Sequence, residues 1–184
     1  GEIRAQGARW AAGRTVTSVF FGGGTPSLLS GGQVQALLDE LRAAFAFSPD
    51  AEITLEGNPG TLTRENLRAY RRAGVNRLSL GVQSFSDALL ARVGRIHTAK
   101  QAEEAVSLAR ETGFDNLNLD LMYGLPGQTE EDFSQSVRRA AQLGAEHLSL
   151  YSLILEEGTP LFRAVQAGEY TLPDDETTLA MQHA

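Results

Sequence analysis

The sequence predicts an α/β fold in which parallel strands and outer helices form a partial TIM-like (βα) barrel. Strand-like and helix-like segments alternate along the 184 residues, as in a parallel sheet with helical crossovers. The expected strands also alternate apolar with polar residues, whereas strands covered by helices on both faces are apolar throughout. A curved sheet with a polar inner face satisfies both observations. The expected strands lie near residues 16–21, 52–57, 76–82, 116–122 and 147–153.

The polar phase of the central strands is the basis for expecting a lined cavity. Ser79, Gly81 and Gln83 alternate with apolar neighbours, and so do Asn118 and Asp120. Successive strand residues point to opposite faces of a sheet. One face is therefore apolar and meets the helices, and we expect the other to line a polar cavity inside the curve.

Capping signals predict where the helices between these strands begin and end. Ser30 with Gln33, and Thr98 with Gln101, have the spacing of a capping box, and Thr129 precedes three acidic residues that suit a helix N-terminus. Glycines are expected just after three helices, at Gly74, Gly113 and Gly144.

Composition and net charge limit the kinds of protein that this chain can be. The 42% hydrophobic content is enough for a sizeable core, and we expect one domain over residues 1–184. Without an apolar run of about 20 residues or a secretory leader, we expect no membrane span and a cytoplasmic protein. The net charge of −7 disfavours nucleic-acid binding. No cysteine is present, which excludes disulfides and thiolate metal sites within these residues.

Both termini fall within amphipathic segments. The last of these begins near Asp174 and continues to Ala184. We therefore expect a barrel that is truncated at both ends, with a following segment starting near 174–184.

A glycine run marks the end of the first expected strand. Gly22, Gly23 and Gly24 follow an apolar segment, and Thr25 and Pro26 follow them. Glycine lacks a Cβ and accepts positive φ, so a ligand can approach the main chain there. A tight turn without a ligand remains an alternative. The run has neither a phosphate-loop nor a dinucleotide-binding pattern.

Polar residues also stand where the later strands end, which in (βα) barrels is where functional groups gather. These are Glu56, Gln83, Asp120 and Tyr151. Glu56 is a candidate acid or base, a ligand acceptor, or a partner of Arg95, whose guanidinium suits a carboxylate. The neighbouring His97 is expected only to cap the next helix. No metal-ligand spacing is present, and the site favours a small, partly cationic ligand with hydroxyls.

Several segments together resemble one known family in order and spacing, and they are residues 20–27, 56–61, 76–85, 94–97, 118–129 and 151–153. The chain is similar to the radical S-adenosylmethionine (SAM) family of oxygen-independent coproporphyrinogen III oxidase, and most similar to its HemW-type heme chaperone branch. The resemblance covers nearly the whole chain and is highly specific. It implies that the expected partial barrel is of the radical SAM type.

The resemblance implies roles for the residues of the expected rim. Gly22, Gly23, Gly24 and Thr25 resemble the segment that binds the methionyl amino group of SAM. Further SAM contacts are implied at Glu56, Gln83, Arg95 and Asp120, with Arg95 contacting the carboxylate.

The family also implies a [4Fe-4S] cluster held by a loop of three cysteines, and this chain departs from that pattern because it has no cysteine. It also lacks the C-terminal heme motif of the branch. Radical chemistry is therefore not expected from the chain alone, and its status as an enzyme stays open. The implied partners are heme or porphyrin and an unknown heme-acceptor protein.

Two alternatives to a heme chaperone remain at this point. One is a coproporphyrinogen III dehydrogenase of the same family. The other is an unrelated (βα) barrel hydrolase or isomerase that uses Glu56 and Asp120 as acid and base.

Overall fold

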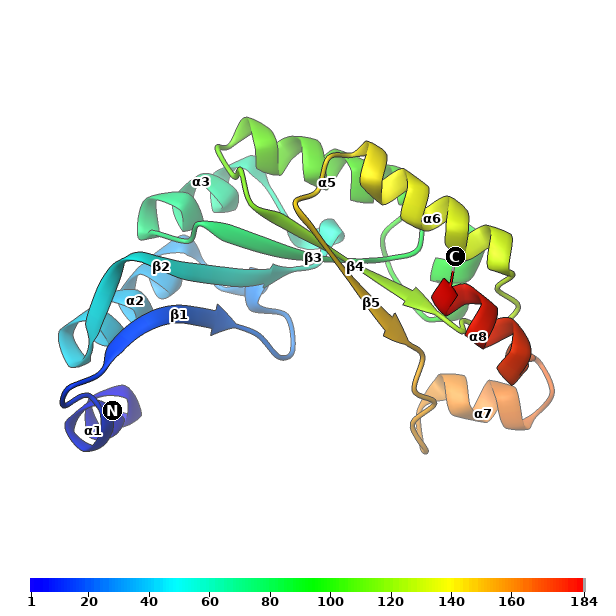
Figure 1. Ribbon diagram of the computed structural model, residues 1–184, viewed down its shortest axis with the longest axis horizontal. Coiled ribbons are helices and arrows are strands. Elements are labelled where there is room, and N and C mark those ends of the chain that lie inside the picture. Colours follow the sequence, from blue (N-terminus) through cyan, green and yellow to red (C-terminus); the bar gives the residue numbers. More distant parts are fainter. Residues whose placement is uncertain (184) are drawn as a thin grey trace.

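The computed structural model describes residues 1–183 and contains one parallel sheet of five strands. Each strand pairs with the next one in the sequence, and the sheet curls into an arch (Figure 1). The predicted partial barrel is confirmed. The strands are β1 (Thr15–Phe21), β2 (Ala46–Gly57), β3 (Arg77–Gln83), β4 (Leu117–Tyr123) and β5 (His147–Ser152).

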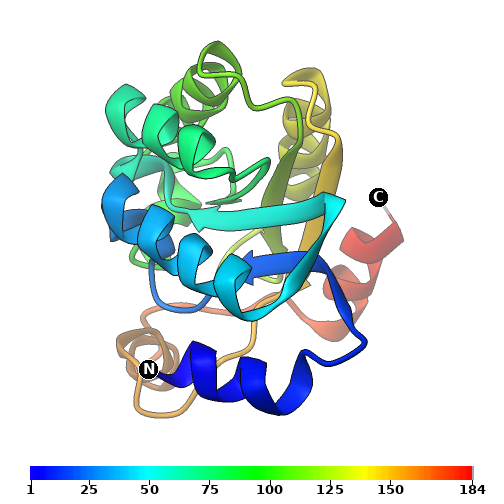
Figure 2. The ribbon, with the colours of Figure 1, turned by 90° about the vertical axis from the view of Figure 1, so that its left-hand side faces the viewer.

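Helices cover the convex side of this arch. Figure 1 shows α3, α5 and α6 above the central strands, with the concave side left open. Seen from the side, α1 lies below α2 and the sheet edge (Figure 2). The helices are α1 (Glu2–Trp10), α2 (Gly31–Ala44), α3 (Arg64–Ala73), α4 (Asp87–Arg92), α5 (Ala99–Glu111), α6 (Glu130–Gln142), α7 (Pro160–Gln166) and α8 (Asp175–His183), with 3₁₀ turns η1 (Pro26–Leu28) and η2 (Pro59–Thr61).

The capping signals act where the sequence placed them. Ser30, Thr98 and Thr129 each form a capping box at the start of α2, α5 and α6. Gly74 ends α3 with a left-handed backbone, at φ 109°. These three helices therefore start, and α3 ends, through local interactions that the sequence encodes.

The apolar phase of the strands forms the core beneath the helices. Leu55, Leu80 and Leu119 are fully buried at the centre of β2, β3 and β4. They pack with helix residues such as Leu67 and Phe133 in one cluster. The burial of this single face fixes the register of the sheet, because a shift by one residue would turn every apolar side chain inward.

The concave face is polar and internally hydrogen-bonded. Asn118 donates from Nδ2 to Ser79 Oγ and to Asp120 Oδ1, both at 2.7 Å. Its Oδ1 accepts from Ser149 Oγ at 3.0 Å and also from the His147 ring. These bonds link β3, β4 and β5 across the inner face, so the polar residues there are mutually satisfied.

Strand β2 is longer than expected. It begins at Ala46 rather than near residue 52, and the segment around Pro49 bulges away from β1 before pairing resumes at Glu52. Proline is compatible with a strand at such a bulge. The Ser-Pro-Asp sequence at residues 48–50 has the composition of a turn, which concealed the start of the strand.

The segment expected from residue 174 onward forms α8, which packs against α6 and β4. Met181 of this helix is buried in the core cluster, and Ala184 lies outside the described residues. No helix within residues 1–183 combines the length and apolarity needed to cross a membrane.

Replacement of Leu119 by Ala should destabilise the protein by about 2–5 kcal/mol, because it leaves a cavity at a fully buried position. Leu28→Ala is the matched control: Leu28 is 72% exposed and its loss should cost no more than about 0.5 kcal/mol. Urea denaturation followed by circular dichroism measures both. Equal effects of the two substitutions would contradict the assignment of the core.

Candidate functional site

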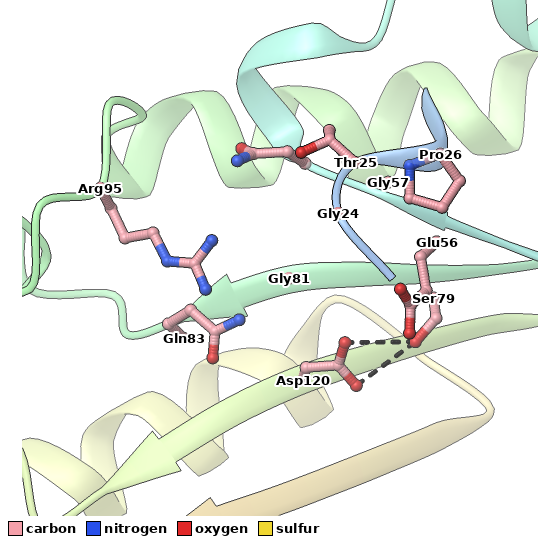
Figure 3. Close-up of a pocket in the computed structure, with 11 residues that line it drawn as sticks. Gly24, Thr25, Pro26, Glu56, Gly57, Ser79, Gly81, Gln83, Arg95 and Asp120 are labelled. Carbon is pink, nitrogen blue, oxygen red and sulfur yellow. Dashed lines mark hydrogen bonds between the residues drawn. The ribbon is translucent and has the colours of Figure 1, made fainter. Parts of the chain in front are cut away.

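A polar pocket of about 210 Å³ opens at the carboxyl ends of β1 to β4. The strands deliver carboxylates from one side, and the turn after α4 delivers an arginine from the other (Figure 3). The location agrees with the general placement of active sites in (βα) barrels. The pocket is lined by Gly24, Thr25, Pro26, Glu56, Gly57, Asn58, Ser79, Gly81, Gln83, Arg95 and Asp120.

The glycine run is tied to Glu56. The backbone N–H of Gly23 donates to Glu56 Oε2 at 3.1 Å, and Gly23 and Gly24 have φ of 82° and 56°, a backbone that favours glycine. Gly24 and Thr25 line the pocket. Gly22 borders only the neighbouring apolar recess, as does Gly23, so these two glycines shape the turn rather than the pocket wall.

Asp120 is the partly buried acid of the site. Ser79 Oγ lies 3.3 and 3.2 Å from its two carboxyl oxygens, and Asn118 donates a further hydrogen bond. Burial raises the pKa of Asp120, the hydrogen bonds from Asn118 and Ser79 counteract this, and the charge of Glu56 raises it further. The pocket therefore holds a carboxylate whose negative charge is incompletely compensated, which favours a cationic ligand.

Arg95 is half-buried. Its guanidinium makes no hydrogen bond or ion pair with any side chain within residues 1–183, so the pairing with Glu56, one of the alternatives left open by the sequence, is not formed. Burial lowers the pKa of Arg95, and the nearby Asp120 opposes that effect. Partial burial of a guanidinium without an ion-pair partner is unfavourable, and a carboxylate from a ligand would relieve this cost.

Gln83 closes the pocket at the end of β3. Its side chain is buried, and a Cβ built on Gly81 would lie 3.0 Å from Gln83 Nε2. Gly81 thus leaves room for the amide of Gln83 to fold back over the strand.

The sequence suggested that His97 caps α5, and this prediction is wrong. Thr98 is the N-cap, whereas His97 is 3% exposed and its Nε2 lies 3.1 Å from the carbonyl oxygen of Val82. The capping box that the sequence predicted at Thr98 and Gln101 is the actual cap of α5. Burial lowers the pKa of His97.

Most of the expected rim residues come together. Thr25, Glu56, Gln83, Arg95 and Asp120 line one pocket together with Gly24. Tyr151 does not; it is 54% exposed on β5. Ser79 and Gly81 also line this pocket. The alternation in β3 placed both on the cavity face, but no role in the site was assigned to them from the sequence.

Comparison with known proteins identifies the family. The model of the Radical SAM superfamily matches residues 2–140. The chain belongs to the radical SAM superfamily. Heme chaperone HemW from Escherichia coli K12 is 49% identical over 167 residues, which are 91% of this chain and 43% of that protein. HemW from Bacillus subtilis 168 is 44% identical, over 89% of this chain and 44% of that protein.

A solved structure gives the same relationship in three dimensions. Coproporphyrinogen III oxidase (HemN) from Escherichia coli superposes with a TM-score of 0.83 and 34% identity, over 99% of this chain and 42% of that one. The chain therefore spans less than half the length of the relatives it matches. It is a radical SAM core homologous to both groups, and the identity to HemW proteins favours the chaperone group over the alternatives.

Membership of this superfamily implies SAM and a [4Fe-4S] cluster. The pocket fits the first, because it combines an unpaired guanidinium, two carboxylates and a glycine turn. The residues of this chain do not fit the cluster. The chain has no cysteine, and residues 1–183 hold no cluster of three or more His, Asp or Glu side chains suited to a metal.

Replacement of Asp120 by Asn should raise the thermal stability of the ligand-free protein while weakening SAM binding. The raised pKa of Asp120 means that ionisation costs the native state free energy above its ordinary pKa of 3.8. A gain of about 1 kcal/mol would raise the melting temperature by about 2–4 °C.

At low pH the carboxyl group of Asp120 is protonated in both the folded and the unfolded protein. The gain in stability from Asp120→Asn should therefore shrink as the pH falls toward 3.8. Calorimetric melting across pH measures it. A gain that is independent of pH would contradict the assignment of a buried, ionised Asp120.

Proposed function

We propose that the chain is the SAM-binding core of a heme chaperone. SAM binding is supported by one observation: the guanidinium of Arg95, which has no ion-pair partner within residues 1–183, faces Glu56 and Asp120 across one pocket (Figure 3). SAM has the complementary pattern, with an ammonium, a sulfonium and one carboxylate. Opposite charges matched in a partly buried site favour that ligand over a neutral or anionic one.

Each wall of the pocket suits one part of that ligand. Arg95 would hold the methionyl carboxylate with a bidentate fork. Glu56 and the backbone of Gly24 and Thr25 would hold the ammonium, and the Gly23 N–H bond already fixes the orientation of Glu56. The Asp120 carboxylate would accept hydrogen bonds from the ribose hydroxyls, and the Gln83 amide would donate a hydrogen bond to them. When bound in this superfamily, SAM is the source of a 5′-deoxyadenosyl radical.

The heme chaperone assignment rests on the relatives. Several curated proteins at 44–49% identity are named heme chaperones, whereas the HemN structure is 34% identical. Heme or porphyrin, and a heme-acceptor protein still to be identified, are the partners that this proposal implies. A cytoplasmic location is a further part of the proposal. Coproporphyrinogen III dehydrogenase is the second candidate, favoured by the close structural match to HemN.

Replacement of Arg95 by Gln should weaken SAM binding about 10- to 100-fold, because charge-assisted hydrogen bonds to the ligand carboxylate are lost. The same change should not destabilise the ligand-free protein, since Arg95 pairs with no side chain within residues 1–183. Titration calorimetry of the intact protein measures the affinity. Arg72→Gln, at an exposed helix position, is the control. Equal affinities of the two variants would contradict the pocket assignment.

The two candidate functions differ in what the intact gene product does in a cell. A heme chaperone should bind heme, seen as a shifted Soret band on titration, and should not restore growth to a strain lacking coproporphyrinogen III dehydrogenase. Rescue of that strain would overturn the chaperone proposal. The Arg95→Gln protein serves in the same assay to show whether rescue depends on the SAM pocket.

A further inference from the structure

Strand β3 ends in a strained turn centred on Gln83. The Ser84 N–H donates to the Val82 carbonyl at 2.9 Å, which closes a three-residue γ-turn. Gln83 has φ 68°, the only positive φ of a non-glycine residue within residues 1–183. A γ-turn with positive φ is rare and strained, and such strain persists only where neighbouring groups hold it. The pairing of β3 with β4 is also irregular between Gly81 and Gln83.

The ring of His97 is one group that holds this turn. Its Nε2 lies 3.1 Å from the same Val82 carbonyl oxygen. A carbonyl oxygen can only accept, so Nε2 must carry the proton. The Val82 oxygen thus accepts two hydrogen bonds, one from inside the turn and one from the loop that leads into α5.

His97 also connects the other walls of the pocket. It lies two residues after Arg95, whose own backbone N–H is fixed to the Leu90 carbonyl at 2.9 Å. A Cβ on Gly60 would lie 3.7 Å from the His97 Cβ, so the histidine packs against η2, which follows Glu56. His97 Nδ1 is buried with no hydrogen-bond partner within residues 1–183. The ring therefore makes its one hydrogen bond to the turn that carries Gln83.

We propose that His97 is a positioning residue that holds the strained turn at Gln83, and with it the Arg95 loop, in the geometry that the pocket needs. His97 itself does not line the pocket, so it acts through Gln83 and Arg95. The claim about ligand affinity rests on the proposed SAM site. The claim about the turn does not.

The two amide replacements of histidine test which ring nitrogen matters. The side-chain nitrogen of glutamine reaches about as far as Nε2, whereas that of asparagine reaches only as far as Nδ1. His97→Gln should therefore keep the bond to Val82 and bind SAM within about threefold of the wild type. His97→Asn should lose the bond and bind about tenfold or more weakly, as release of the strained turn implies.

Hydrogen exchange of the Ser84 amide provides a readout that does not depend on SAM. In the intact, ligand-free protein, exchange at Ser84 should speed up about tenfold or more in His97→Asn and stay near the wild-type rate in His97→Gln. Val106→Ala, a truncation in the core on α5, controls for general destabilisation and should leave SAM affinity unchanged.

Each outcome decides one of the two claims. Equal exchange rates and affinities for His97→Asn and His97→Gln would overturn the positioning role. A wild-type protein that fails to bind SAM would overturn the proposed function, and the exchange rates would still decide whether His97 holds the turn. If His97→Asn does not fold, the Gln83→Gly background removes the left-handed strain. The double variant should then recover folding, and its failure to do so would count against the proposal.

Discussion

The one-sided burial of a parallel sheet is the constraint on which this structure depends. Helices pack on only one face, and the apolar phase of each strand supplies that face with residues such as Leu80 and Leu119. The opposite phase is left to polar residues, which have to satisfy one another across strands, as Asn118 does with Ser79 and Asp120. Curvature of the sheet then gathers these polar groups around a hollow, which is what makes a binding site possible.

The electrostatics of the pocket follow from that arrangement. Carboxylates project from β2 and β4, the two strands that flank β3, and burial together with the charge of Glu56 raises the pKa of Asp120. Arg95 approaches from outside the sheet and meets no anion among the described residues. The pocket therefore keeps separated opposite charges in place before any ligand arrives. Such preorganisation strengthens binding, because few groups have to be reordered when the ligand enters.

The sequence was most informative where a local rule applied. The alternation around Ser79 and Gln83 predicted the faces of the sheet, and the Ser30 and Thr98 boxes predicted helix starts. Features that depend on distant residues were not predictable. The start of β2 at Ala46 depends on pairing with β1. Likewise, the role of His97 depends on the carbonyl of a strand fifteen residues away, and no local pattern reports it.

The incompletely compensated charge of Asp120 couples ligand binding to the release of a proton into the solvent. A positive centre placed beside this carboxyl group would lower its raised pKa, so the bound state would hold its proton less tightly than the free state. In the pH range between the two pKa values, binding would therefore release part of a proton to the buffer. The heat of binding in that range would depend on the ionisation enthalpy of the buffer chosen.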